Sequence, residues 1–167
     1  MLATEYENVR PDILTLGKSI SGGFMPVSVA LADNAIMDLI KPGEHGSTFG
    51  GCPMASRVAK AALEVIRDEG LVENSFKMGE VLRSELADMD YPVLQSFRGR
   101  GLMNALVIDE SLGRTAGDIC MQLAKEGLLC KQTAGNVIRL TPPLIISESE
   151  MAQGIDILRK VLAQYKI

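Results

Sequence analysis

The sequence of 167 residues has little of what marks several classes of protein. Its three cysteines are odd in number and have no CxxC spacing, so we expect neither a disulfide framework nor a zinc site. Reduced intracellular thiols are expected instead. A net charge of −4 argues against a broad basic surface for nucleic acid. The apolar runs are short and interrupted, and therefore predict no membrane-spanning helix.

The N-terminus also lacks a recognisable targeting segment. Its first residues, MLATEYE, have neither the pattern of a secretory signal nor that of an arginine-rich transit peptide. What the chain does have is 47 % apolar and 23 % charged residues, the balance of a soluble globular protein with a core. Its length fits one domain or a part of a larger protein.

Hydrophobic periodicity and turn residues predict an α/β chain. Strands are expected over residues 12–16, 27–31, 93–97, 102–108, 128–131 and 137–140. Helices are expected over residues 34–40, 53–69, 72–87 and 116–126, and from a capping box at residues 147–150 to about Lys166. We interpret residues 1–70 as the C-terminal part of a larger α/β domain whose upstream strands are absent, and residues 71–167 as a smaller α+β domain.

Lys18 stands at the end of a short apolar strand, directly after Gly17 and shortly before two more glycines. A lysine on a flexible backbone can present its amine to a carbonyl group, as a Schiff-base enzyme requires. The GKS sequence here also resembles the end of a Walker A motif. That motif needs a glycine where Asp12 stands, so a phosphate loop is not expected. A solvated surface lysine remains open.

Three segments carry motifs in a fixed order and at suitable spacing. They are residues 9–28 around Lys18, the loop KPGEHGSTFGG at residues 41–51, and IRLTPPL at residues 138–144. Together they resemble the fold-type I, class-III aminotransferases that use pyridoxal phosphate, and most of all the members that use ornithine. The resemblance runs nearly end to end. It implies an α/β fold, with the end of the large pyridoxal-phosphate-dependent transferase domain followed by a C-terminal α+β small domain.

The resemblance also implies roles for individual residues. Lys18 is the implied catalytic residue: it holds pyridoxal 5′-phosphate through its amine, is displaced by the substrate amine, and then carries a proton between the substrate α-carbon and the cofactor. Ser47 and Thr48 are expected to bind the cofactor phosphate of a neighbouring subunit, which implies a homodimer or a higher homo-oligomer. A glycine-rich turn with incidental hydroxyls is the alternative for this loop.

Arg139 lies in an apolar strand that should be largely buried. A buried arginine needs a carboxylate partner, which its planar fork can bind through two hydrogen bonds. The resemblance implies the substrate α-carboxylate, and a structural ion pair remains the alternative.

His45 is the one histidine, and we expect a structural role rather than a general base. Cys52 replaces the family's usual asparagine before Pro53 and should be a poorer helix cap.

The implied reaction transfers the δ-amino group of L-ornithine to 2-oxoglutarate, giving glutamate-5-semialdehyde and glutamate. Acetylornithine and 4-aminobutyrate are alternative amino donors. No metal, nucleic acid or membrane partner is expected. Family members work in the mitochondrial matrix of eukaryotes or otherwise in the cytoplasm. They also carry an upstream half, which holds the phosphate-binding glycine turn, a stacking aromatic ring and the acid that pairs with the pyridine nitrogen. We therefore expect the isolated chain to be inactive, and a truncated non-catalytic fragment is the other hypothesis.

Overall fold

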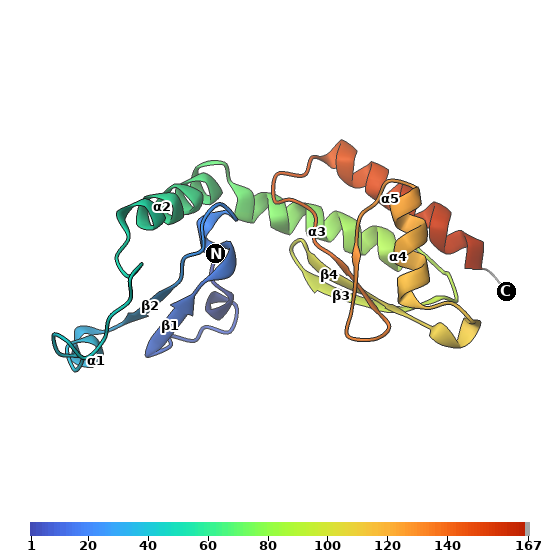
Figure 1. Ribbon diagram of the computed structural model, residues 1–167. Coiled ribbons are helices and arrows are strands. Elements are labelled where there is room, and N and C mark those ends of the chain that lie inside the picture. The colour runs from blue at the N-terminus through green and yellow to red at the C-terminus, as the bar shows by residue number, and fades with distance from the viewer. Residues whose placement is uncertain (166–167) are drawn as a thin grey trace. The chain divides into compact units, whose positions relative to one another are not determined.

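The computed structural model describes residues 1–165, which form helices and strands as the α/β pattern predicts (Figure 1). The chain divides into two compact units, Met1–Glu69 and Gly70–Ile167. The expected end of the last helix, at Lys166, lies outside the described residues.

The first unit contains a two-stranded antiparallel ribbon that frames the Lys18 segment. Strand β1 (Ile13–Leu16) pairs with strand β2 (Val29–Ala32), and the 3-10 helix η2 (Lys18–Ser21) lies in the connection between them. The remaining elements of this unit are η1 (Ala3–Glu5), α1 (Asn34–Met37) and α2 (Pro53–Asp68). Both expected strands and helix α2 are confirmed to within two residues at either end.

Helix α2 provides the main packing surface of the first unit. It begins at Pro53, which suits the first turn because proline has no N–H to leave unpaired. The preceding Cys52 makes no side-chain capping hydrogen bond, as its poor capping chemistry predicts. Ala55 and Ala59 are the only buried apolar residues in the described first unit, whereas Phe24 is 87 % exposed. This unit has little core of its own.

The second unit is a four-stranded antiparallel sheet with helices on one face (Figure 1). The strand order is β3-β4-β6-β5. The strands are β3 (Leu94–Arg100), β4 (Met103–Ile108), β5 (Lys131–Thr133) and β6 (Val137–Leu140). The helices are α3 (Leu71–Ala87), α4 (Ala116–Lys125) and α5 (Glu148–Leu162), with short 3-10 turns η3 (Glu110–Leu112) and η4 (Ala163–Tyr165).

Successive side chains along each strand point to opposite faces of the sheet, and those on one face point into the core. In β4, Leu106 and Ile108 are fully buried, while Val107 between them is only partly covered. Leu106 and Ile108 belong to one cluster with apolar side chains from α3, α4 and α5, among them Leu82, Leu123 and Leu158. An antiparallel sheet of this kind can leave its second face open.

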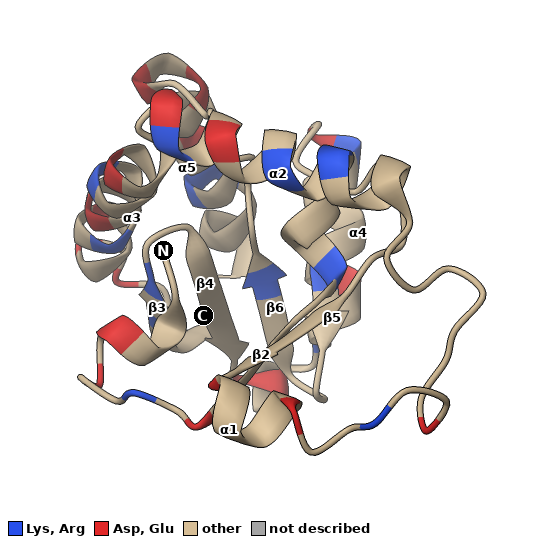
Figure 2. Cartoon of the chain, turned by 90° about the vertical axis from the view of Figure 1, so that its left-hand side faces the viewer, with Lys and Arg blue, Asp and Glu red and all other residues tan. Residues whose placement is uncertain are grey.

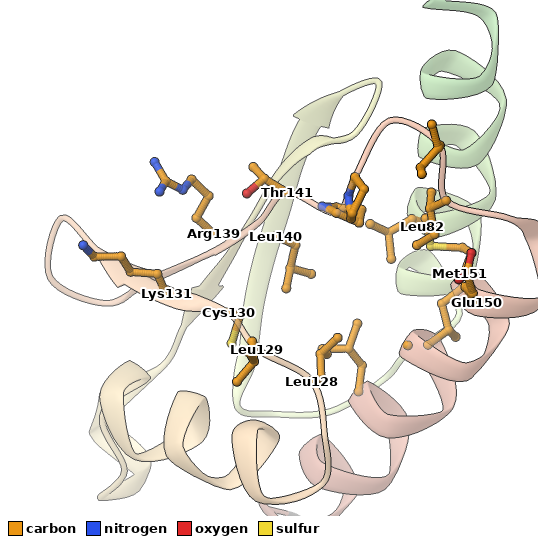
Figure 3. Close-up of a pocket in the computed structure, with 17 residues that line it drawn as sticks. Leu82, Leu128, Leu129, Cys130, Lys131, Arg139, Leu140, Thr141, Glu150 and Met151 are labelled. Atoms are coloured by element: carbon orange, nitrogen blue, oxygen red, sulfur yellow. The ribbon is translucent and has the colours of Figure 1, made fainter. Parts of the chain in front are cut away.

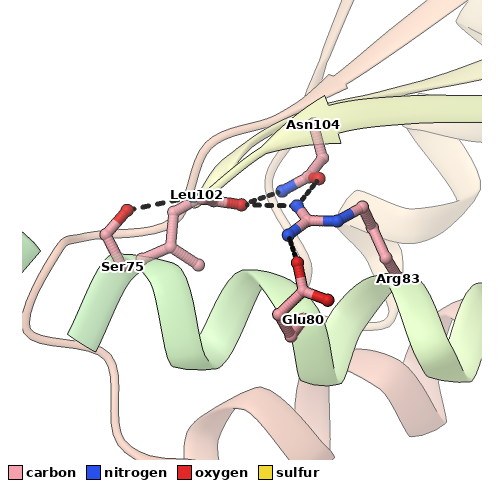
Figure 4. Close-up of polar contacts among 6 residues, drawn as sticks. Ser75, Glu80, Arg83, Leu102 and Asn104 are labelled. Atoms are coloured by element: carbon pink, nitrogen blue, oxygen red, sulfur yellow. Dashed lines mark hydrogen bonds and ion pairs between the residues drawn. The ribbon is translucent and has the colours of Figure 1, made fainter. Parts of the chain in front are cut away.

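Helix α3 contacts the turn between β3 and β4 at very short range. A Cβ atom added to Gly79 would lie 2.1 Å from the carbonyl oxygen of Gly101, so no larger residue fits there. Arg83 donates hydrogen bonds of 2.9 Å both to that carbonyl and to the buried Asn104, and it also pairs with Glu80 (Figure 4). These contacts attach the hairpin to the helix.

The capping box that begins α5 is confirmed. The Ser147 hydroxyl accepts from the Glu150 N–H, and the Ser147 N–H donates to the Glu150 carboxylate at 2.9 Å. This backbone hydrogen bond favours the charged carboxylate and lowers the pKa of Glu150. Helix α4 begins with the same arrangement at Thr115 and Asp118, which the sequence analysis did not predict.

The prediction of a strand over residues 128–131 is wrong for all of these residues except Lys131. Gly127 ends α4 in a left-handed conformation, and the Leu128 N–H donates to the Leu123 carbonyl at 2.9 Å. The Leu128 N–H therefore belongs to the motif that ends α4 and cannot pair with a neighbouring strand. Strand β5 begins only at Lys131.

Charged residues of both signs are spread over the helices (Figure 2). Among residues 1–165, helices that combine the length and the apolar character needed to cross a membrane are absent.

The short contact at Gly79 provides a stability test. We expect Gly79→Ala to lower the free energy of unfolding by about 3 kcal/mol, because the added methyl group collides with backbone that cannot move independently. Urea unfolding followed by circular dichroism measures this change. Gly154→Ala in α5 is the matched control: its nearest neighbour is a flexible leucine carbon at 3.8 Å, and the better helix propensity should add about 0.5–1 kcal/mol. Equal stability of the two variants would contradict the packing described here.

Candidate active site

Lys18 has a backbone conformation that side-chain-bearing residues rarely adopt. Its φ of 55° lies in the left-handed region, which costs about 1–2 kcal/mol for a residue with a Cβ. Gly17 before it is extended, and Gly22, with φ of 62°, ends η2. Strained backbone of this kind is concentrated at functional sites, where the surrounding structure holds it in place.

The packing of η2 holds Lys18 in this conformation. Helix η2 contacts α2, Ser21 is buried, and a Cβ at Gly22 would lie 3.4 Å from the Ala62 side chain. The Lys18 side chain itself is exposed and, within residues 1–165, makes no hydrogen bond or ion pair. The amine is therefore free to react with a ligand.

The loop that carries Ser47 and Thr48 is exposed over residues 41–51. The Gly50 N–H donates to the Ser47 carbonyl at 3.0 Å, which forms a tight turn beginning at Ser47. Neither hydroxyl has a hydrogen-bond partner in the described chain, and none links this loop to Lys18. His45 is likewise exposed and unpaired among these residues, so the first unit shows no contact that would give it a structural role.

Arg139 is exposed, which corrects the expectation of a largely buried strand. In β6, Ile138 and Leu140 are buried, and Arg139 points to the opposite face of the sheet. The reason is that helices cover only one face of this sheet, so alternate residues of β6 remain outside. The alternative of a structural ion pair is not supported, because no acidic side chain pairs with Arg139 in the part of the chain that the structure describes.

A second cation lies directly beside Arg139. Lys131 of β5 is opposite Arg139 in the strand register, and both side chains extend to the same side (Figure 3). On the other side of β6, Ala105 faces Arg139, and Arg98 follows on β3. Like charges directly opposite each other destabilise a sheet unless an anion lies between them. This edge can therefore bind a carboxylate.

Sequence reasoning missed Lys131, because its position depends on the register of a strand whose start was placed wrongly. The available signal was the turn at Gly135-Asn136, which joins β5 to β6 as a hairpin.

A cavity of about 590 Å³ adjoins these cations. Its walls are mainly apolar and come from α5, β6 and residues 128–130, with Lys131 and Arg139 also among the lining residues (Figure 3). This volume is within the range of about 300–1,000 Å³ that is typical of small-molecule sites.

The free donors fit the chemistry of pyridoxal phosphate in part. The Lys18 amine suits an aldehyde carbon, and the Ser47 and Thr48 hydroxyls suit a phosphate. An acid for the pyridine nitrogen was not identified in the sequence. Asp12, one residue before β1, is exposed and lies too close to Lys18 along the chain to be assigned that role.

The chain resembles known proteins over nearly its whole length. Residues 1–162 match the sequence profile of the class-III aminotransferases. The mitochondrial ornithine aminotransferase of Drosophila melanogaster is 51 % identical over 162 residues, which are 97 % of this chain and 37 % of the fly protein. The chain thus spans a little over a third of the length of this relative.

Solved structures of the family share the fold. Acetylornithine aminotransferase from Elizabethkingia anophelis has a TM-score of 0.92 and 46 % identity, over 98 % of this chain and 43 % of that one. An ornithine aminotransferase from Toxoplasma gondii has a TM-score of 0.92 and 39 % identity, over 98 % of this chain and 39 % of that one. The latter was crystallised with oxidised glutathione and has pyridoxal phosphate at partial occupancy in its active site. The match in sequence and backbone covers nearly the whole chain, which therefore belongs to the class-III aminotransferases, a family of pyridoxal-phosphate-dependent enzymes.

Proposed function

We propose that this chain supplies the catalytic lysine, the phosphate-binding hydroxyls and the carboxylate-binding arginine of an ornithine aminotransferase. The observation that carries the proposal is Lys18, an exposed and unpaired amine on a strained backbone, in the segment that resembles the family's lysine motif. Identity of 51 % to the fly enzyme supports ornithine as the amino donor. The reaction moves the δ-amino group of ornithine to 2-oxoglutarate and gives glutamate-5-semialdehyde and glutamate.

The domain assignment is part of this proposal. Residues 1–70 correspond to the C-terminal part of the large cofactor-binding domain, and residues 71–167 to the small domain. The low burial of apolar side chains in the first unit supports this reading, because large exposed apolar surfaces mark contacts with further protein. A homodimer or higher homo-oligomer would bring Ser47 and Thr48 to the cofactor phosphate of a neighbouring subunit. In a eukaryote, the mitochondrial matrix is the proposed compartment.

Lys18 has two tasks in the proposed reaction. Pyridoxal phosphate, when bound, supplies the electron sink for the charge that develops on the reacting carbon of the substrate. The Nζ atom of Lys18 is the group that would hold the cofactor until the substrate amine replaced it. The released amine would then take the proton from the carbon that bears the reacting nitrogen and deliver it to the bound cofactor, and it would carry a proton in the opposite direction in the return half of the reaction.

Arg139 has the geometry to orient the substrate. Its guanidinium can bind a carboxylate through two parallel hydrogen bonds, and Lys131 beside it adds a second positive charge. Ornithine bound by its α-carboxylate directs its δ-amino group away from the arginine. The same pair can hold a carboxylate of 2-oxoglutarate in the return half of the reaction.

A second candidate donor is acetylornithine. The solved acetylornithine aminotransferase is as similar in fold to this chain as the Toxoplasma ornithine enzyme, at a TM-score of 0.92 for both, and it is more similar in sequence. Comparing the kcat/KM of ornithine, acetylornithine and 4-aminobutyrate with the full-length protein tests the choice. A higher kcat/KM for acetylornithine or 4-aminobutyrate would overturn the assignment of ornithine as the amino donor.

Cofactor attachment can be tested directly. The full-length protein mixed with pyridoxal phosphate should show a visible absorption band that borohydride removes, and peptide mapping should then find the reduced cofactor on Lys18. Lys18→Ala should lose the band, while Lys60→Ala, on the exposed face of α2, should keep it. Cofactor found on another lysine would contradict the assignment.

The isolated 167-residue chain should not catalyse transamination, and measurable turnover by it would refute the incomplete-site hypothesis.

The backbone of Lys18 predicts a separation between stability and activity. Lys18→Gly should unfold with a free energy about 1 kcal/mol higher than Lys18→Ala, because glycine adopts the left-handed conformation without strain. Both variants should lack transamination activity. Chemical denaturation of the two variants measures the difference, and equal midpoints would show that the left-handed conformation is not retained in solution.

Arg139→Gln in the full-length protein should lower kcat/KM for ornithine by roughly 10- to 100-fold, because a charge-assisted hydrogen-bonded pair is lost. Arg139→Lys should recover only part of this, since an ammonium cannot form the two-fold contact. Arg98→Gln is the charge-matched control, about 10 Å away across two strand spacings, and should change kcat/KM little. Equal losses in both variants would indicate a general charge effect and exclude the direct contact.

A further inference from the structure

Two of the three cysteines lie together in the second unit. Cys120 is on α4, and Cys130 directly precedes β5. Their Sγ atoms are 3.5 Å apart, and the Cys130 thiol donates a hydrogen bond to the Cys120 sulfur. The third, Cys52, belongs to the first unit. The sequence predicts reduced thiols, because the three cysteines are odd in number and have no CxxC spacing.

We propose that Cys120 and Cys130 form a reversible modification site, which a peroxide oxidises to an intramolecular disulfide. A disulfide has an S–S distance of about 2.05 Å, so the two sulfur atoms must approach by roughly 1.5 Å. Small rotations of the two side chains can achieve this, because α4 ends at Lys125 and the chain then reaches Cys130 through the turn at Gly127, outside any helix or strand.

The oxidation balances with one peroxide molecule per pair. The Cys120 sulfur attacks one peroxide oxygen, the O–O bond breaks, and the other oxygen leaves as water after it takes up a proton. The Cys130 sulfur then attacks the resulting sulfenic acid, the S–O bond breaks, and a second water leaves with the Cys130 proton. Two thiols lose two electrons in total, and the peroxide is reduced to two water molecules.

The environment assigns the two thiols different parts in this sequence. Burial and the neighbouring Cys120 raise the pKa of the Cys130 thiol to about 12, so Cys130 keeps its proton and donates it to Cys120. Because Cys130 keeps its proton, Cys120 is the sulfur that attacks the peroxide, and Cys130 lies within reach of the sulfenic acid that follows. Cys130 lines the 590 Å³ cavity, through which a small oxidant can approach the pair (Figure 3).

The disulfide would connect the middle of α4 to the residue that precedes β5, an edge strand of three residues. Closing this short loop restricts the unfolded chain and should raise the midpoint of thermal unfolding. The proposal is independent of the aminotransferase reaction, because every readout below is a property of the thiols.

The experiment uses the reduced chain, hydrogen peroxide at one equivalent, and a maleimide that labels remaining thiols. We expect labelling to fall from three thiols to one, with the label on Cys52. Trypsin cleaves after Lys125 and so places the two cysteines on different peptides, which should appear joined until dithiothreitol is added. Cys52→Ser should leave the joined peptides unchanged. Cys130→Ser should stop at a sulfenic acid on Cys120, which dimedone traps.

Other outcomes would overturn the proposal. These are three thiols still labelled, a disulfide that includes Cys52, disulfide-linked dimers, and separate sulfinic acids on Cys120 and Cys130. Peptide mapping of the unsubstituted chain distinguishes all of them, so the result does not depend on whether the serine variants fold.

Discussion

The close approach of α3 to the β3–β4 turn is the contact on which the second unit depends. Gly79 and Gly101 allow the two backbones to meet, and Arg83 joins the turn carbonyl to the buried Asn104. This contact fixes the position of β4, and the pairing of β4 with β6 then places Arg139. Because the helices occupy only one face, that register turns Arg139 outward beside Lys131 and leaves both cations without protein partners among residues 1–165.

The first unit is organised on a different principle. It buries almost no apolar side chain of its own, yet it holds Lys18 in a left-handed conformation. The strain is supported locally by η2 packing on α2, with Ser21 buried and Gly22 against Ala62. An unpaired amine on a strained turn supports the proposed covalent role over a solvated surface lysine, because a merely solvated lysine needs no special backbone.

Elements with a strong local signal could be predicted from the sequence. Helix α2 was placed by Pro53 and its apolar stripe, α5 by the capping box at Ser147, and β1 by the apolar run before Gly17. The segment over residues 128–131 could not be placed, since apolar composition does not reveal that the Leu128 N–H caps α4. Residue type likewise could not show the exposure of Arg139, which follows from having helices on only one side.

Residue identity and spacing were enough to assign the family and to recognise its three motif segments, around Lys18, at residues 41–51 and at residues 138–144. Which side chains meet follows from the tertiary structure alone. It placed Lys131 opposite Arg139 through strand register, and brought the Cys130 thiol to the Cys120 sulfur across the turn at Gly127. Both contacts arise from backbone hydrogen bonds and packing between separate elements, which no local pattern of residues encodes.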